Sequence, residues 1–183
     1  NHDPVGEVGV DDYSTISWAD EQSVIAWLGN DMQRTAFREL KALEPFVKSS
    51  GDAELLRLWR LLQISDHIYY MYTEPGPAGM VHGYFSQQFP TEAFWAFMKV
   101  ASDFHEKVAD ALSGEKRTTA RLLRAVPPDM AFHMHEEGTY INLSAHSLEE
   151  LADVVKLASD KSLLFHMACK HFDRWVRFTI GDG

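Results

Sequence analysis

The stretch of sequence that decides the fold runs from residue 91 to residue 112 and reads TEAFWAFMKVASDFHEKVADAL. Its large apolar residues recur at intervals of three and four, which places them on one face of an α-helix. Thr91 is a suitable N-cap residue after Pro90, and Ser113-Gly114 ends the helix. The predicted buried face consists of Phe94, Phe97, Met98, Ala101, Phe104, Val108 and Leu112. A helix with one such face must pack against other helices.

Two more helices are expected before this one. The first begins at Ser17, a capping residue answered by Asp20, and runs to about Val47, with Gly29 marking a close contact. The second spans about residues 53–72 and carries Asp66 on its apolar side. Short links between three amphipathic helices predict an antiparallel helical bundle, so the chain is expected to be mainly α.

The pattern changes after residue 126. Alternating apolar and polar residues over 132–135 and 140–143 flank Gly138 and predict a β-hairpin. Ser147 and Glu150 form a capping-box pattern that opens a helix to about residue 158, and Asp160 is expected to cap a last helix. The expected inner face of that last helix is Leu164, Ala168, Phe172, Trp175, Val176 and Ile180. A small α+β unit, a hairpin plus two helices, should therefore follow the bundle.

These patterns divide the chain into four parts. We expect an irregular leader over residues 1–16, a helical bundle over 17–113, a connector over 114–127 and an α+β tail over 128–183.

Composition excludes several classes of protein. The net charge is −10 with no basic cluster, so binding to nucleic acid or to an anionic membrane surface is not expected. No apolar run approaches the roughly 18 residues that a membrane helix needs. The polar residues 1–12 resemble neither a signal peptide nor a transit peptide, so we expect a cytoplasmic protein, and a start at Asn1 suits a piece of a longer one. The single cysteine, Cys169, is expected to be a small buried side chain.

Three segments, in this order and spacing, carry a resemblance to a known family. They are SWAD at 17–20 with WLGNDMQ at 27–33, WRLLQISDHIYYM at 59–71, and VHGYF at 81–85 with EAF at 92–94. Together they resemble the region that follows the barrel in α-amylases of glycoside hydrolase family 57. The resemblance covers about residues 17–104. More weakly, AHSL at 145–148 and FDRW at 172–175 resemble a small domain of unknown role at the end of some of these enzymes.

The resemblance implies a role for residues 65–70. In the family this segment is a conserved motif that projects into the cleft at the barrel. By that resemblance Asp66 contacts sugar hydroxyls and Tyr69 shapes the subsite, with His67 and Tyr70 also in the binding region. The alternative is that Asp66 is a buried polar residue satisfied inside the bundle by Arg60 or His67. The chain departs from the family pattern at Thr73-Glu74-Pro75, in the loop 75–80 and at Gln87-Gln88, so contacts from these loops stay open.

The resemblance also implies that the catalytic residues lie elsewhere. Family 57 enzymes are retaining and use a glutamate and an aspartate on barrel strands, and the sequence contains no candidate for either strand. We therefore expect no catalytic residue, metal or cofactor in this chain. Its expected partners are an α-glucan or maltooligosaccharide and a β/α barrel of the same polypeptide. The alternative is a stand-alone, non-catalytic carbohydrate-binding or protein-interaction module.

Other clusters receive plainer interpretations. His133 and His135 share a strand face near His146, but a zinc site needs more ligands, so solvent-facing histidines are expected. Asp103, His105 and Glu106 are expected on a solvated helix face. Without a barrel, an exposed surface is expected at Trp18, at Trp27 or at the aromatic loop with Tyr84 and Phe85, and self-association of the chain is expected there.

Overall fold

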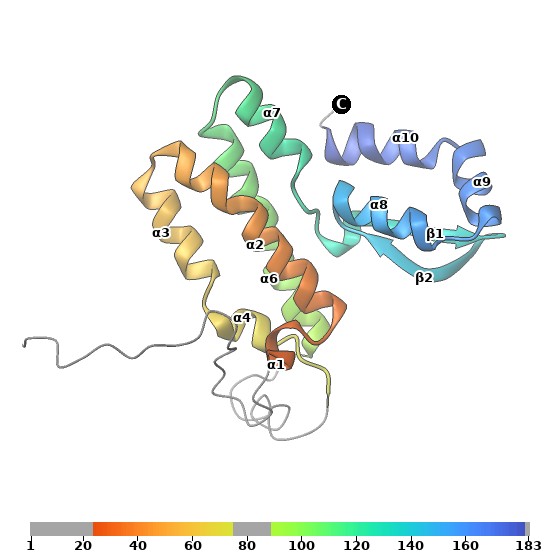
Figure 1. Cartoon of the computed structure of the whole chain (residues 1–183), viewed down its shortest axis with the longest axis horizontal. Coiled ribbons are helices and arrows are strands. Elements are labelled where there is room, and N and C mark those ends of the chain that lie inside the picture. The colour runs from red at the N-terminus through yellow and green to blue at the C-terminus, as the bar shows by residue number, and fades with distance from the viewer. Residues whose placement is uncertain (1–23, 75–88, 182–183) are drawn as a thin grey trace, which may run out of the picture.

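The computed structural model describes residues 24–74 and 89–181, which form a helical bundle with a smaller α+β unit beside it (Figure 1). The bundle contains α1 (Ile25–Leu28), α2 (Asp31–Ser50), α3 (Ala53–Leu62), α4 (Ser65–Tyr69), α6 (Pro90–Asp110) and α7 (Gly114–Leu122). The α+β unit contains the 3₁₀ turn η1 (Pro128–Met130), strands β1 (Phe132–Glu136) and β2 (Thr139–Ala145), helices α8 (Leu148–Leu157), α9 (Asp160–Ala168) and α10 (His171–Trp175), and the π-helical turn η2 (Val176–Ile180). The predicted fold class is confirmed.

Helices α2 and α6 lie side by side and form the centre of the bundle (Figure 1). Every residue of the apolar face predicted for 91–112 is at most 8% exposed. Burying one side chain of this size stabilises the fold by about 1.5–3 kcal/mol. The cap of α6 differs from the prediction, because Phe89 rather than Thr91 is the N-cap residue and its N–H donates to the Glu92 carboxylate at 3.1 Å. Pro90 then occupies the first helical position, where its missing N–H has no intrahelical partner to lose.

The first predicted helix is interrupted at Gly29 in the structure. Asn30 caps α2 in a capping box: its side chain accepts from the Gln33 N–H at 3.0 Å, and the Gln33 side chain accepts from the Asn30 N–H at 3.2 Å. A Cβ at Gly29 would lie 2.4 Å from the Ile25 carbonyl oxygen, so no larger residue fits without a backbone shift. This contact is with the preceding turn of α1 and not with another helix, and Gly29 marks the end of α1. The helix start expected at Ser17 lies outside the described residues.

The second predicted helix is also two helices. Helix α3 ends at Leu62, Gln63 and Ile64 break the hydrogen-bonding pattern, and α4 begins at Ser65. The break rotates the following residues to new faces, so Asp66 is exposed instead of lying on the apolar side. Both the expectation of an acid on the apolar stripe and the alternative of a buried, internally satisfied Asp66 are therefore wrong.

A buried hydrogen bond joins α2 to α6. His105 is 0% exposed and its Nδ1 lies 2.5 Å from a carboxylate oxygen of Glu39, which is 2% exposed. The other Glu39 oxygen accepts from the Ala125 N–H at 2.9 Å, so the same carboxylate also holds the segment after α7. The expected solvated face is confirmed for Asp103 but is wrong for His105. His105 follows Ala101 by four residues and so falls on the buried side of α6.

The predicted hairpin is confirmed. Strands β1 and β2 pair antiparallel, and Glu137 and Gly138 form the turn with φ of 51° and 84°. His133 pairs with Ser144 and His135 with Tyr140, so the three residues 141–143 oppose one residue of β1 in a bulge. The helices α8, α9 and α10 pack beside the hairpin around a core that includes Phe132, Met134, Val154, Trp175 and Ile180.

Helix α8 begins where Ser147 predicts, but only half of the expected capping box forms. The Ser147 hydroxyl accepts from the Glu150 N–H at 3.2 Å. The Glu150 carboxylate does not answer the cap. It accepts instead from the His146 N–H at 2.9 Å and from the Thr35 hydroxyl at 2.5 Å. Because Thr35 belongs to α2, Glu150 ties the α+β unit to the bundle.

Helix α9 differs from the prediction in its cap and in its buried face. Ser159 rather than Asp160 is the N-cap residue, and its hydroxyl accepts from the Ser162 N–H at 3.2 Å. Ser162 and His166 are the buried residues of α9, whereas Leu164 is 66% exposed. The predicted inner face is therefore wrong within α9, because the packing against β1 selects polar side chains there.

The last helical segment is broken at Lys170, whose φ of 54° lies in the left-handed region. The break separates α9 from α10, and beyond it the predicted residues Trp175 and Ile180 are buried. Cys169 lies at this corner and is exposed, so the expectation of a buried cysteine is wrong.

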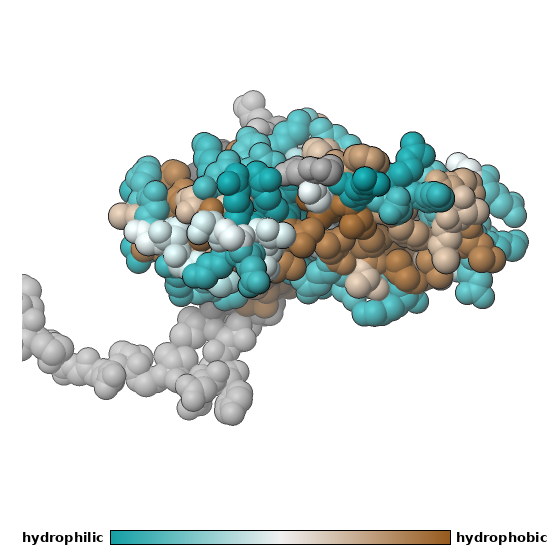
Figure 2. Space-filling view, turned by 90° about the horizontal axis from the view of Figure 1, so that it is seen from above, coloured by the Kyte–Doolittle hydropathy of each residue, from teal (hydrophilic) through white to brown (hydrophobic). Residues whose placement is uncertain are grey.

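Apolar surface gathers over the α+β unit when the molecule is seen from above (Figure 2). The unit exposes large apolar side chains, among them Leu157, Leu164, Met167 and Phe178, each at least 64% exposed. In the described part of the chain, no helix combines the length and the apolar character needed to cross a membrane.

The buried histidine of α9 takes part in a hydrogen-bonded cluster. His166 is 2% exposed, its Nε2 accepts from the His135 N–H at 2.9 Å, and its Nδ1 lies 3.0 Å from the Nδ1 of His171. Burial lowers the pKa of His166, and the neighbouring His171 and His135 lower it further. A nitrogen that accepts from a backbone N–H carries no proton of its own, so the native state needs a neutral His166.

We expect the protein to lose stability on acidification between about pH 7.5 and about pH 5, a range that spans the ordinary histidine pKa of about 6.5. The unfolded chain binds a proton more readily than native His166, so this contribution is complete above about pH 6.5 and is lost as the pH falls toward the lower folded pKa. Thermal denaturation at both pH values measures the loss. His166→Gln, which keeps an acceptor for the His135 N–H, should reduce it, and the exposed control His67→Gln should not. Equal losses in wild type and His166→Gln would contradict this assignment.

Candidate functional site

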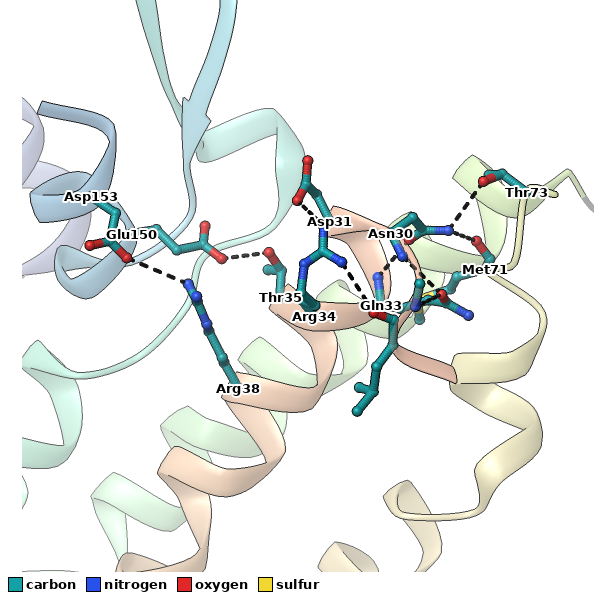
Figure 3. A network of polar contacts seen from close by, with 12 residues as sticks. Asn30, Asp31, Gln33, Arg34, Thr35, Arg38, Met71, Thr73, Glu150 and Asp153 are labelled. Carbon is teal, nitrogen blue, oxygen red and sulfur yellow. Dashed lines mark hydrogen bonds and ion pairs between the residues drawn. The ribbon is translucent and has the colours of Figure 1, made fainter. Parts of the chain in front are cut away.

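A buried polar network fixes the end of the bundle that carries α4 (Figure 3). Gln33 is 0% exposed, and its Nε2 donates to the carbonyl oxygens of Ala26 at 2.6 Å and Ile68 at 3.2 Å. The Asn30 side chain donates to the Met71 carbonyl at 2.7 Å. The Gln33 amide thus joins α1 to α4, and the Asn30 amide holds the residues that follow α4. A buried polar group without a hydrogen-bond partner destabilises the fold, so this network fixes the position of α4 relative to α1 and α2.

The two tyrosines of the predicted site have different surroundings. Tyr69 is 3% exposed and packs against Trp27, with 5.8 Å between the ring centroids. Tyr70 is half-buried and contributes to the wall of a small hollow. Tyr69 can therefore position α4 but offers little surface to a ligand, whereas Tyr70 is accessible.

Asp66 and His67 are the exposed members of the predicted site. Asp66 lies in the first turn of α4, where the positive end of the helix dipole favours a carboxylate. His67 lies beside Phe97 of α6, with 6.2 Å between ring centroids. Asp66, His67 and Tyr69 thus lie on one short helix, with Tyr70 at its C-cap, and Asp66 and His67 are exposed to a ligand.

Two hollows lie beside α4. The larger one has a volume of about 640 Å³, and Ser65 lies in its wall with Trp27, Phe37 and Trp59. The smaller one has a volume of about 200 Å³ and is lined in part by His67 and Tyr70. Asp66 lines neither hollow, although its sequence neighbours Ser65 and His67 each line one of them.

The larger hollow combines ring faces with a polar rim. The Trp59 Nε1 donates to the Leu40 carbonyl at 3.1 Å, which fixes the indole in the wall. Gln63, Lys41 and Glu44 supply donors and acceptors around the rings. Aromatic walls with a few polar groups are typical of small-molecule sites. The arrangement can hold an apolar face of a ligand and hydrogen-bond its hydroxyls.

Sequence reasoning missed the walls of this hollow. The sequence gives no role to Phe37 or Gln63, and Trp59 enters only as the first residue of the segment 59–71. The signal that was present is the spacing of Trp59 and Gln63, which lie four residues apart and therefore on one side of α3. Phe37 gave no signal, because its part in the hollow depends on where α3 and α4 pack against α2.

The histidines of the α+β unit have partners of their own. His133 Nδ1 lies 2.7 Å from the Ser144 hydroxyl, and His146 Nδ1 lies 3.0 Å from the Glu150 carboxylate. Burial lowers the pKa of His133, and His146 and His135 add to the effect. Across the described residues, no group of three or more His, Cys, Asp or Glu side chains is placed to hold a metal ion.

Most of the aromatic residues that the sequence predicts at an exposed surface cannot be placed in the structure. Trp18, Tyr84 and Phe85 lie outside the described residues. Trp27 is half-buried against Tyr69 rather than fully exposed. Self-association through these rings stays a prediction.

Comparison with known proteins identifies one similar archaeal protein. Over 121 residues the chain is 35% identical to the "Putative alpha-amylase" of Methanocaldococcus jannaschii. The match includes 61% of this chain and 26% of the archaeal protein, so the chain spans about a quarter of that relative's length. No family model matches the chain, and no solved structure gives a significant match.

Proposed function

We propose that this chain completes the substrate cleft of an α-glucan-active glycoside hydrolase and is not catalytic by itself. The observation that carries the proposal is the 35% identity over 121 residues to the archaeal protein described above. That relative is about four times as long as the matched part, which leaves room for a separate catalytic domain in a protein of this kind. We further propose that the parent enzyme is of the family 57 type and retaining, with its two catalytic carboxylates on a barrel in the same polypeptide.

Within this proposal the four residues of the predicted site have distinct roles. Asp66 is exposed and accepts hydrogen bonds from sugar hydroxyls, and a carboxylate can accept several at once. His67 and Tyr70 line the smaller hollow and contact an adjacent sugar ring. Tyr69 positions α4 through its packing on Trp27. The two hollows beside α4 support this division, because a glucan chain is longer than one sugar and needs neighbouring contacts.

The test is hydrolysis by the natural gene product that contains these 183 residues. Incubated with maltoheptaose, it should release shorter oligosaccharides whose new reducing ends first appear in the α configuration, as retention requires. Release of products in the β configuration would contradict the retaining assignment. No cleavage of any α-glucan would overturn the glycosidase assignment and leave the stand-alone binding module.

A further inference from the structure

A second cleft lies between the bundle and the α+β unit, away from α4. It has a volume of about 520 Å³, with α2 on one side and β2 and α8 on the other, and no residue of α4 lines it. Figure 3 shows the side chains of α2 and α8 pointing toward each other across this gap. The residues that carry the argument are Asp31, Arg38, Tyr140, Asn142, Glu150 and Asp153.

The carboxylate at the floor of this cleft already has hydrogen-bond partners within the protein. The Glu150 carboxylate accepts from the Thr35 hydroxyl at 2.5 Å and from the His146 N–H at 2.9 Å. Burial tends to raise the pKa of Glu150, but the hydrogen bonds from His146 and Thr35 outweigh it and hold that pKa below its ordinary value. The floor therefore holds a fixed carboxylate, and the two units of the fold are joined there without a ligand.

The rim of the cleft has unused hydrogen-bonding capacity. The Arg38 guanidinium lies 3.9 Å from the Asp153 carboxylate, longer than the roughly 2.7–3.2 Å of a direct hydrogen bond. Among the described residues this is the only polar contact of the Arg38 side chain. The Asn142 side-chain amide likewise has no hydrogen-bond partner among the described residues. Arg38 and Asn142 come from opposite walls, so both face one space.

The backbone at Asn142 is held in an uncommon conformation. Its φ of 59° lies in the left-handed region, which asparagine adopts more readily than other non-glycine residues. Asn142 lies in the middle of the β2 bulge, whose neighbours Tyr140 and Ser144 are linked by a 2.7 Å hydrogen bond between their hydroxyls. The bulge thus sets Tyr140, 46% exposed, and Asn142 along the same wall.

We propose that this cleft is a second binding site and that its ligand is a neutral, hydroxyl-rich molecule, namely a short stretch of α-glucan. The charged side chains on the walls include two oppositely charged pairs, Arg34 with Asp31 and Arg38 with Asp153. An anion or a cation bound there would therefore lie close to a group of its own charge. A sugar hydroxyl both donates and accepts hydrogen bonds, so it can bridge the Arg38 guanidinium and the Asp153 carboxylate. The Asn142 side-chain amide can likewise donate to and accept from a neighbouring sugar hydroxyl. The Tyr140 ring supplies an apolar face. The choice of a glucan rests on the proposed function, whereas the location and the hydroxyl-rich class rest on the cleft.

The test is a titration of the ¹⁵N-labelled protein with maltotriose, followed by the backbone amide signals. We expect signals of residues 140–144 and 150–153 to shift with saturation. Asn142→Gly removes the amide and suits the left-handed backbone, so it should fold normally and weaken this binding at least tenfold. Arg38→Gln should weaken it similarly, and the control Arg57→Gln, on the exposed side of α3, should not.

Several outcomes overturn the inference. Shifts confined to α4, or shifts at the cleft that Asn142→Gly leaves unchanged, would remove the second site. Tighter binding of inorganic phosphate than of maltotriose at the cleft would overturn the ligand class. The proposed function is judged separately, because loss of cleft binding should leave maltoheptaose hydrolysis by the natural gene product detectable, and absence of hydrolysis would not affect the cleft signals.

Discussion

Replacing Asp66 with alanine is expected to lower kcat/KM for maltoheptaose about 100-fold in the natural gene product, as measured by steady-state kinetics. A hydrogen bond to a charged group contributes about 1.5–3 kcal/mol. A carboxylate that holds two sugar hydroxyls in the transition state can therefore account for about 2.7 kcal/mol, which corresponds to the 100-fold change. Because Asp66 is exposed and the fixing network of α4 uses Gln33 and Asn30, the substitution should leave the fold intact.

The matched control for this experiment is Asp103→Ala. Asp103 is an exposed helical aspartate on α6 and makes no side-chain hydrogen bond or ion pair with a described residue. It should retain wild-type kcat/KM. Equal activity in the two variants would show that the carboxylate of Asp66 has no particular role, and the assignment of α4 as a sugar-binding element would then be wrong.

The largest effect on stability is expected from Glu39→Ala, which should lower the free energy of unfolding by about 3–5 kcal/mol. The substitution leaves the fully buried His105 and the Ala125 N–H without their shared acceptor. It also opens a cavity between α2 and α6. Denaturant unfolding followed by circular dichroism measures the loss.

Two further variants separate the buried pair from a general effect of removing charge. Glu39→Gln keeps an oxygen acceptor and should lose less stability than Glu39→Ala. Glu115→Ala removes an exposed helical glutamate on α7 and should leave the unfolding midpoint close to wild type. A Glu39→Ala variant as stable as Glu115→Ala would mean that the Glu39–His105 contact is not part of the native core.

The parts of the fold that could be predicted are those decided by local pattern. The apolar face of 91–112 repeats over more than five helical turns, so its burial follows from periodicity alone. The hairpin follows from alternation around Gly138, and the start of α8 follows from Ser147. In each case the residues that decide the structure are close together in the sequence.

The breaks at Gly29 and at Gln63-Ile64 were harder to predict. Asn30 and Gln33 form a capping box that competes with continuing the first helix, and its strength comes partly from Gln33 reaching the Ile68 carbonyl. Ile68 is 35 residues away, so the pattern within the first helix cannot reveal it. At Gln63-Ile64 there is no glycine or proline to mark the break.

The candidate site was predictable in its location but not in its surroundings. Resemblance to a family motif selected residues 65–70, yet exposure of Asp66 depends on the break before α4. Phe37 and Trp59, which line the larger hollow beside α4, come from two other helices. The burial of Glu39 with His105 and the cleft beside Asn142 depend in the same way on contacts between distant segments. Spacing along the chain does not encode such contacts.

The central claim is that α4 touches an α-glucan, and a crystal structure of the natural gene product with a bound maltooligosaccharide tests it most directly. The account predicts a sugar hydroxyl within about 2.6–3.2 Å of the Asp66 carboxylate, a direct hydrogen bond. It also predicts a neighbouring ring beside His67 and Tyr70. A maltooligosaccharide bound in the catalytic cleft with Asp66 facing only solvent would contradict the claim.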